Sequence, residues 1–125
     1  MAFIIWTILL SRRSLIILKL TIIHGCMCCG QKMTVLEPNT TDAAVEKHVP
    51  EYKVEGDTVT VTVSSVEHPM VDEHYIQWIS LQTNEGNQRR VLKPGDKPVA
   101  VFKLNGTEKV EAAYAYCNLH GLWKK

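Results

Sequence analysis

Four of the five histidines in this 125-residue chain lie, together with one cysteine, in three short clusters. The first cluster ends at His48, the second holds His68 and His74, and the third contains Cys117 and His120. Imidazole nitrogen and thiolate sulfur are the usual protein ligands of iron, copper and zinc. Five such donors exceed the four of a structural zinc site, so the sequence predicts a metal centre with a position left open for chemistry.

Two charged residues directly precede the first histidine of this set. Glu46 and Lys47 are tethered within reach of any metal that His48 binds. A lysine at this place offers a mobile positive charge to an anionic substrate, and a glutamate offers a proton carrier or a sixth ligand. Without a metal site beside them, the same two residues would be a solvated ion pair of little consequence.

The composition is that of one globular domain with a small appendage. The chain is 46% hydrophobic and 22% charged, which is enough for a substantial core at this length. Its formal net charge is only +1 and no basic stripe stands out, which argues against nucleic acid as a partner. Three of the four cysteines are clustered at Cys26, Cys28 and Cys29, which suits metal ligation in a reducing cytoplasm better than a disulfide framework.

The N-terminal segment has two apolar runs separated by a polar turn at residues 11–14. Neither run reaches the roughly 20 residues of a membrane-spanning helix. The positive charges lie between the runs, whereas a signal peptide has its charge before the apolar stretch. We expect two buried strands joined by the turn, and contact of residues 1–23 with a membrane surface is the alternative.

The chain beyond residue 52 has the pattern of an antiparallel β-sandwich. Valine and threonine alternate over residues 57–63, which predicts a strand with its valines on one face. A second strand is expected over residues 75–83, with Ile76 and Trp78 on the same face. The turn at residues 84–87 predicts a hairpin with the strand that follows. The remaining strands are predicted at residues 88–92, 99–104 and 109–116.

Two other functions would also use these ligands. A cupredoxin-like electron carrier is a β-sandwich with histidine and cysteine ligands near its last strand, but it needs only two histidines and no methionine follows His120. A non-catalytic interaction module with structural zinc would have a closed, four-coordinate site. A lone histidine, or a lone Cys117, is more often a satisfied core residue than a ligand, so the prediction depends on all five residues together.

Five motifs surround the clusters in order along the chain. They are Glu46-Lys47-His48-Val49-Pro50, Ser65-Val66-Glu67-His68-Pro69-Met70, Glu73-His74-Tyr75-Ile76-Gln77-Trp78-Ile79, Leu92-Lys93-Pro94-Gly95-Asp96-Lys97-Pro98 and Tyr116-Cys117-Asn118-Leu119-His120-Gly121-Leu122-Trp123-Lys124. In these motifs the chain resembles the superoxide reductases of the desulfoferrodoxin and neelaredoxin family, over about residues 28–125. The last motif is highly specific.

The resemblance implies an immunoglobulin-like β-sandwich with one mononuclear iron. The four histidines would supply equatorial nitrogens and Cys117 the axial sulfur, with the sixth position open in the ferrous state. Superoxide would bind there and take one electron and two protons to give hydrogen peroxide. Lys47 would attract the anion, and Glu46 would occupy the open position in the ferric resting state. The usual electron donor of the family is rubredoxin or a similar small redox protein.

The N-terminal part departs from the fuller family pattern. Desulfoferrodoxins have a small desulforedoxin-like domain, in which a Cys-x-x-Cys pair precedes Cys-Cys-Gly. Only Cys28-Cys29-Gly30 is present here; Ser11 and Ser14 lie near the place of the missing pair, and Cys26 has the wrong spacing. We therefore expect no second iron at Cys28 and Cys29.

The resemblance also predicts two segments and an oligomeric state. Residues 1–36 would be an apolar arm and degenerate desulforedoxin-like segment, and residues 37–125 the iron-binding sandwich. Relatives of this type are commonly homodimers, and an apolar arm could contribute to such an interface.

Overall fold

The computed structural model describes residues 27–28, 30–32 and 34–125. The strand pair predicted within residues 1–23, its turn, Cys26 and Cys29 lie outside the described residues. The described elements are, in order, β1 (Met27–Cys28), β2 (Gln31–Lys32), α2 (Val45–His48), β3 (Pro50–Glu55), β4 (Thr58–Val63), β5 (Ile76–Thr83), β6 (Asn87–Val91), β7 (Val99–Lys103), β8 (Val110–Cys117) and β9 (Gly121–Lys124). No helix among the described residues is long and apolar enough to cross a membrane.

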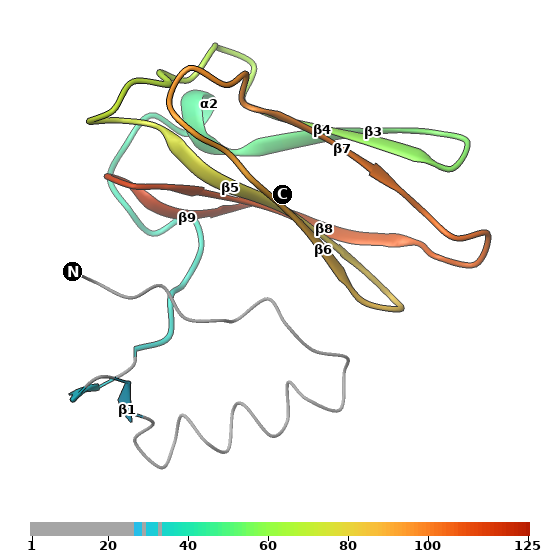
Figure 1. Ribbon diagram of the computed structural model, residues 1–125, viewed down its shortest axis with the longest axis horizontal. Helices are drawn as coiled ribbons and strands as arrows, with labels where there is room; N and C mark the ends of the chain where they lie inside the picture. The colour runs from blue at the N-terminus through green and yellow to red at the C-terminus, as the bar shows by residue number, and fades with distance from the viewer. Residues whose placement is uncertain (1–26, 29, 33) are drawn as a thin grey trace.

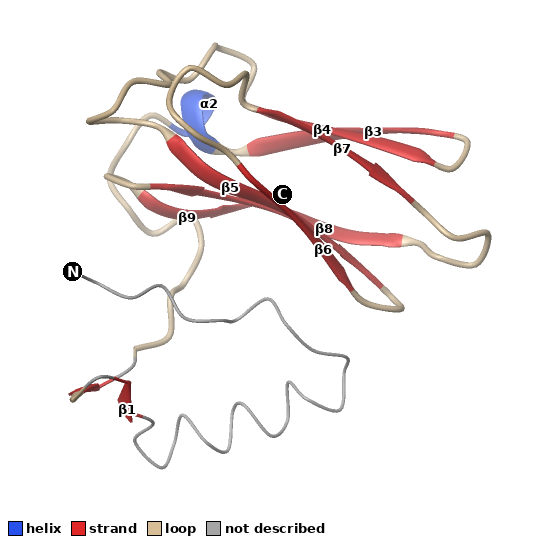
Figure 2. Cartoon of the chain, viewed as in Figure 1, coloured by secondary structure: helices blue, strands red, loops and turns tan. Residues whose placement is uncertain are grey.

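Two antiparallel sheets face each other and enclose the core (Figures 1 and 2). One sheet has the order β3-β4-β7 and the other the order β6-β5-β8-β9. A separate two-stranded hairpin, β1-β2, precedes them along the chain. The prediction of an all-β, immunoglobulin-like antiparallel sandwich is confirmed.

The alternating pattern of β4 points one face of the strand into the core. Val59, Val61 and Val63 are fully buried, whereas the threonines between them are only half-buried. Val59 and Val61 lie opposite Phe102 and Ala100 of β7. Burial of a valine side chain is worth about 1.5–3 kcal/mol, so this strand contributes substantially to the stability of the sandwich.

The face predicted for Trp78 is wrong, because β5 contains a β-bulge. Ile76 pairs with Cys117, but Trp78 pairs with Tyr116, so an extra residue is inserted on β5 between the two pairs. Ile76 therefore points into the central core. Trp78 packs in a second cluster, where it stacks on Tyr116 at 5.6 Å and lies beneath the Arg89 guanidinium at 4.1 Å.

Three elements extend beyond the predicted pattern. The polar connector before residue 52 contains the short helix α2 and the start of β3. The chain also does not end in β8: it turns at residues 118–120, and β9 returns beside β8 with Gly121 opposite Cys117. Gly121 has φ +75°, a left-handed conformation that glycine adopts without strain.

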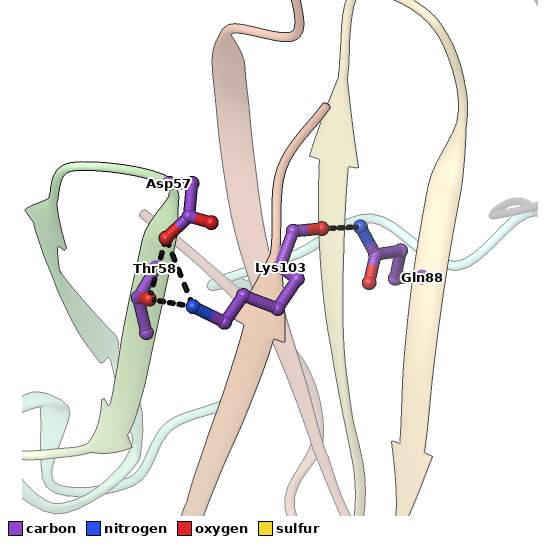
Figure 3. Close-up of polar contacts among 4 residues, drawn as sticks. All are labelled: Asp57, Thr58, Gln88 and Lys103. Carbon is purple, nitrogen blue, oxygen red and sulfur yellow. Dashed lines mark hydrogen bonds and ion pairs between the residues drawn. The ribbon is translucent and has the colours of Figure 1, made fainter. Parts of the chain in front are cut away.

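A polar contact joins the two sheets along the side formed by β6 and β7 (Figure 3). Gln88 Nε2 of β6 donates a hydrogen bond to the Lys103 carbonyl of β7 at 2.7 Å. The Lys103 ammonium in turn donates to Asp57 at 2.9 Å and to Thr58 Oγ1 at 2.6 Å. The Gln88 bond links the outer strands of the two sheets, and the Lys103 contacts link β7 to the start of β4 within one sheet.

The loops with the predicted ligands gather at one end of the sandwich (Figure 1). Helix α2, the connection between β4 and β5, and the turn between β8 and β9 meet there. The β3–β4, β5–β6 and β7–β8 turns lie at the opposite end.

Candidate metal centre

His48 is the last residue of α2 and its side chain is 2% exposed. Its Nδ1 lies 2.7 Å from the Ala44 carbonyl, one turn back along the helix. A carbonyl only accepts hydrogen bonds, so Nδ1 bears the proton and the lone pair is left on Nε2. The helix therefore presents one specific nitrogen of His48 to the cluster.

His68 and His74 come from the connection between β4 and β5. His68 is also 2% exposed, and its Nδ1 lies 2.6 Å from the Pro69 carbonyl, which leaves its Nε2 free as well. His74 is held through its backbone, which exchanges two hydrogen bonds of 3.0 Å with Val71. The Gly95 N–H bonds to the Met70 carbonyl at 2.7 Å and ties this connection to a neighbouring loop.

Cys117 and His120 flank the tight turn between β8 and β9. Cys117 is a free, fully buried cysteine at the end of β8. Its Sγ lies 3.7 Å from Nδ1 of His120, and the same Nδ1 lies 2.8 Å from Nε2 of His48. His120 thus faces the cluster with Nδ1, whereas His48 faces it with Nε2.

The four imidazoles are arranged in a cycle around the centre. Neighbouring rings in the order His48, His68, His74, His120 have centroids 4.5–4.8 Å apart and planes inclined by 76–83°. The diagonal pair His48 and His74 is farther apart, at 6.1 Å, with planes inclined by only 27°. All pairs of ligands at the corners of a tetrahedron are equally far apart, so shorter neighbouring separations and a longer diagonal suit four nitrogens in a square around one ion better than tetrahedral zinc.

The donor set fits a metal ion. The five ligand atoms all lie within 4.8 Å of one another. Within the described part of the chain, Nε2 of His68 and Nε2 of His74 are buried without a hydrogen-bond partner. Buried polar atoms are normally satisfied, and a metal at this point would satisfy both. All five ligands predicted from the sequence are brought together.

Burial favours the neutral form of three imidazoles, those of His48, His68 and His74, and the neutral form is the one that binds a metal. Burial first, and then the neighbouring imidazoles, lower the pKa of His48 and His74 below the usual 6.5 and that of His68 to about 4. Burial also raises the pKa of the Cys117 thiol, which the backbone N–H groups of His120 and Leu119 oppose in part. A bound cation would favour the thiolate and reverse this shift.

Glu46 and Lys47 are exposed on α2, beside the cluster. After burial and the other imidazoles, the positive charge of Lys47 also lowers the pKa of His48 and His74, so its field acts at the centre. The Glu46 carbonyl accepts hydrogen bonds from the Val66 N–H and the Ser65 hydroxyl, both at 3.5 Å. The helix is thereby joined to the loop that leads to the second cluster.

Two residues beside the ligands have roles that we did not predict. Trp123 of β9 is 1% exposed and stacks on the His48 ring at 4.9 Å and 22°. Asn118 joins the turn after Cys117 to the backbone on both sides of His74. In the sequence, Asn118 lies between the two predicted ligands Cys117 and His120, and asparagine is common in turns. These two features could have identified Asn118 in advance.

The alternative metal sites fit this geometry less well. A blue-copper site uses two histidines, a cysteine and a weak axial methionine. Here four imidazoles surround the centre, and Met70 Sδ instead accepts a hydrogen bond from the Ile76 N–H at 3.4 Å. A structural zinc site would leave one of the five donors unused.

Comparison with known proteins agrees with this site. The desulfoferrodoxin family profile matches residues 40–125. The chain belongs to the desulfoferrodoxin family. The desulfoferrodoxin of Syntrophotalea carbinolica is 50% identical over 107 residues, which are 82% of each chain. The superoxide reductase of Pyrococcus horikoshii is 42% identical over 96 residues, which are 63% of this chain and 84% of the relative.

Solved structures place this desulfoferrodoxin-family protein in the same fold group. The superoxide reductase from Treponema pallidum superposes with a TM-score of 0.77 at 40% identity, over 81% of this chain and 84% of that one. The superoxide reductase from Giardia intestinalis gives a TM-score of 0.55 at 42% identity, over 64% of this chain and 95% of that one.

Proposed function

We propose that this desulfoferrodoxin-family protein is a superoxide reductase. The observation on which the proposal rests is the buried group of four imidazoles and one thiol, within 4.8 Å of one another, at the loop end of the family's sandwich. The reaction adds one electron and two protons to superoxide and gives hydrogen peroxide. Unlike dismutation, it consumes an external electron and releases no dioxygen.

The proposed ligands of one mononuclear iron are His48, His68, His74, Cys117 and His120. When bound, the iron supplies the single electron of the reaction and leaves one coordination position for chemistry. Burial favours the neutral form of three nitrogen donors, His48, His68 and His74, and backbone carbonyls orient two of them. The N–H groups of Leu119 and His120 near Cys117 Sγ support the thiolate that the metal requires.

Lys47 and Glu46 are the proposed catalytic side chains. Lys47 is exposed, yet its charge is felt at His48 and His74, so it can draw a small anion to the centre and donate a hydrogen bond to it. Glu46, its neighbour on α2, can deliver a proton or cap the open position in the resting state.

Further proposals concern the setting of the enzyme. The electron donor is a rubredoxin-like protein, the protein works in the cytoplasm as a homodimer, and no second iron binds at Cys28 and Cys29. Residues 1–36 form the appendage and residues 37–125 the catalytic sandwich. Iron analysis of purified protein, together with light scattering, should give one iron per chain and twice the chain mass; two irons per chain would restore the N-terminal centre.

The direct test is the stoichiometry of the reaction. Iron-loaded protein with a reducing system should form one hydrogen peroxide for each superoxide consumed, without dioxygen. A dismutase would form one for every two and release dioxygen, and a mere electron carrier would not accelerate superoxide loss. Protein loaded with zinc in place of iron is the control, because zinc has no redox chemistry. A one-to-two ratio, or equal rates with zinc, would refute the proposal.

A further inference from the structure

Asn118 connects two of the segments that contain the proposed metal ligands. Its side chain lies between the turn that contains Cys117 and His120 and the loop that contains His74. Nδ2 donates to the Glu73 carbonyl at 2.9 Å, and Oδ1 accepts from the Tyr75 N–H at 2.9 Å. The Asn118 N–H also donates to the Tyr75 carbonyl at 3.2 Å.

These three hydrogen bonds bracket one ligand. Glu73 and Tyr75 are the residues immediately before and after His74, so the bonds fix the backbone on both sides of that imidazole. On the other side, Asn118 directly follows Cys117, and its Oδ1 lies 3.9 Å from Cys117 Sγ. The Asn118 amide therefore contributes two of the three hydrogen bonds that place His74 relative to Cys117.

His74 needs this support more than the other histidines of the first two clusters. The rings of His48 and His68 are each oriented by a hydrogen bond from Nδ1 to a backbone carbonyl. Within the described part of the chain, no ring-to-backbone bond of that kind is found for His74, and its Nε2 is buried without a partner. The direction of its lone pair then depends on the backbone on either side.

We propose that Asn118 is a positioning residue, whose amide holds His74 and Cys117 in the relative placement that a metal ion requires. The inference rests on the metal centre of the proposed function, but not on the reaction there. Groups that orient metal ligands typically change metal affinity about 10–100-fold when they are removed.

A matched control exists at the opposite end of the sandwich. Asn84 makes the same pair of contacts that Asn118 makes with Tyr75: its N–H donates to the Lys109 carbonyl at 3.1 Å, and its Oδ1 accepts from the Lys109 N–H at 2.6 Å. Asn84→Ala removes a similar clamp in the β5–β6 turn, which lies at the end of the sandwich opposite the ligand loops (Figure 1). It measures the effect of losing such a contact on stability alone.

The test is titration of metal-free full-length protein with Co²⁺, followed by the absorption of the thiolate-to-cobalt charge-transfer band. We expect Asn118→Ala to bind Co²⁺ about 10–100-fold more weakly than the wild type, with a shifted band, and Asn84→Ala to match the wild type. If Asn118→Ala does not fold, Asn118→Ser serves instead, because serine is favoured in turns and also lacks the amide.

Two results would overturn the proposal. One is wild-type Co²⁺ affinity and an unchanged band in the Asn118 variant. The other is an equal loss of Co²⁺ affinity in Asn84→Ala, which would mean that the weaker binding of the Asn118 variant reflects a general loss of stability. Wild-type protein that binds Co²⁺ but, loaded with iron, fails to reduce superoxide would refute the proposed function and leave the role of Asn118 intact.

Discussion

Two imidazoles of the cluster, those of His48 and His68, are prepared for a metal by their own surroundings. His48 and His68 have Nδ1 directed at a carbonyl, and burial lowers their pKa, so neutral rings with the lone pair on Nε2 are favoured before any ion binds. Cys117 is different, because burial favours its protonated form. At the scale of the residue, the Cys117 thiol is therefore the ligand whose charge depends most on whether a metal is bound.

Replacement of this sulfur should change the spectrum before it changes the fold. We expect Cys117→Ser to remove the thiolate-to-iron charge-transfer absorption of the ferric protein, because the hydroxyl oxygen is a harder and weaker ligand. Serine is close in size to the buried cysteine, so far-ultraviolet circular dichroism should still show the β-sandwich. A charge-transfer band unaltered in the variant would exclude Cys117 as a ligand.

Lys47 should affect the rate of encounter with superoxide. We expect Lys47→Ala to lower the second-order rate constant about tenfold at low ionic strength, because the positive charge beside the centre steers a small anion. The difference from wild type should shrink as salt is added. Stopped-flow measurement with the reduced protein at several ionic strengths tests this.

The control for Lys47 is another exposed lysine at the far end of the sandwich. Lys109→Ala changes the net charge of the protein equally, but Lys109 lies in the β7–β8 connection. Its rate constant should stay near that of the wild type. Equal rates for Lys47→Ala and the wild type at every salt concentration would disprove the steering role.

At the scale of the element, α2 is stabilised by contacts with the rest of the fold. A four-residue helix is far too short to be stable alone, and Ala44 at its N-cap makes no side-chain capping bond. The helix is held by the Glu46 carbonyl, which accepts from the loop after β4, and by the Val49 carbonyl, which accepts from the Ser64 N–H at 3.2 Å. The sheets thus support the element that presents His48.

The strands themselves should differ sharply between their two faces. Val61 of β4 is fully buried, whereas Val101 of the adjacent β7 is 49% exposed. We expect Val61→Ala to lower the free energy of unfolding by about 2 kcal/mol, because two buried methyl groups are lost and a cavity remains. The same substitution at Val101 should change it by less than about 0.5 kcal/mol.

Denaturant unfolding of the Val61→Ala and Val101→Ala variants tests this predicted difference in stability. The lowered midpoint should appear in Val61→Ala only, with the slope of the transition unchanged. Similar midpoints for both variants would mean that the predicted inward face of β4 is not the one that stabilises the sandwich.

At the scale of the whole molecule, the buried histidines link stability to pH. Burial, and then the neighbouring imidazoles, hold the pKa of His48 and His74 below 6.5 and that of His68 at about 4. In the unfolded chain these rings take up protons near pH 6.5, so acid favours unfolding. Metal-free protein should keep its stability above pH 6.5 and lose it progressively as the pH falls to about 4.

Urea unfolding of chelator-treated protein at a series of pH values measures this linkage. The midpoint should be flat from pH 8 to 7 and fall below pH 6.5. Asp57, whose pKa the Lys103 contact lowers from 3.8, acts only in more acidic solution and so does not mask the effect. A midpoint that stays constant down to pH 4.5 would show that the histidines are not buried neutral.

Much of the fold was predictable because its pattern is local. The alternation in β4 and the turn before β6 depend on residues close together in the chain, and both were predicted correctly. The bulge that turns Trp78 away from Ile76, and the helix that ends at His48, could not be predicted, because they depend on packing between distant segments. Strand β9 was missed because a three-residue turn reverses the chain directly after β8.

The sequence alone determined which side chains gather in the proposed metal centre, because five soft and borderline donors in a chain otherwise nearly free of histidine leave little choice. Only the tertiary structure decided which nitrogen of each ring faces the centre, the cyclic order of the rings, and the role of Asn118. The physical reason is distance along the chain: His48 meets His120 across 72 positions, and Asn118 meets Tyr75 across 43. Contacts of that range arise from how the two sheets pack, which no local pattern encodes.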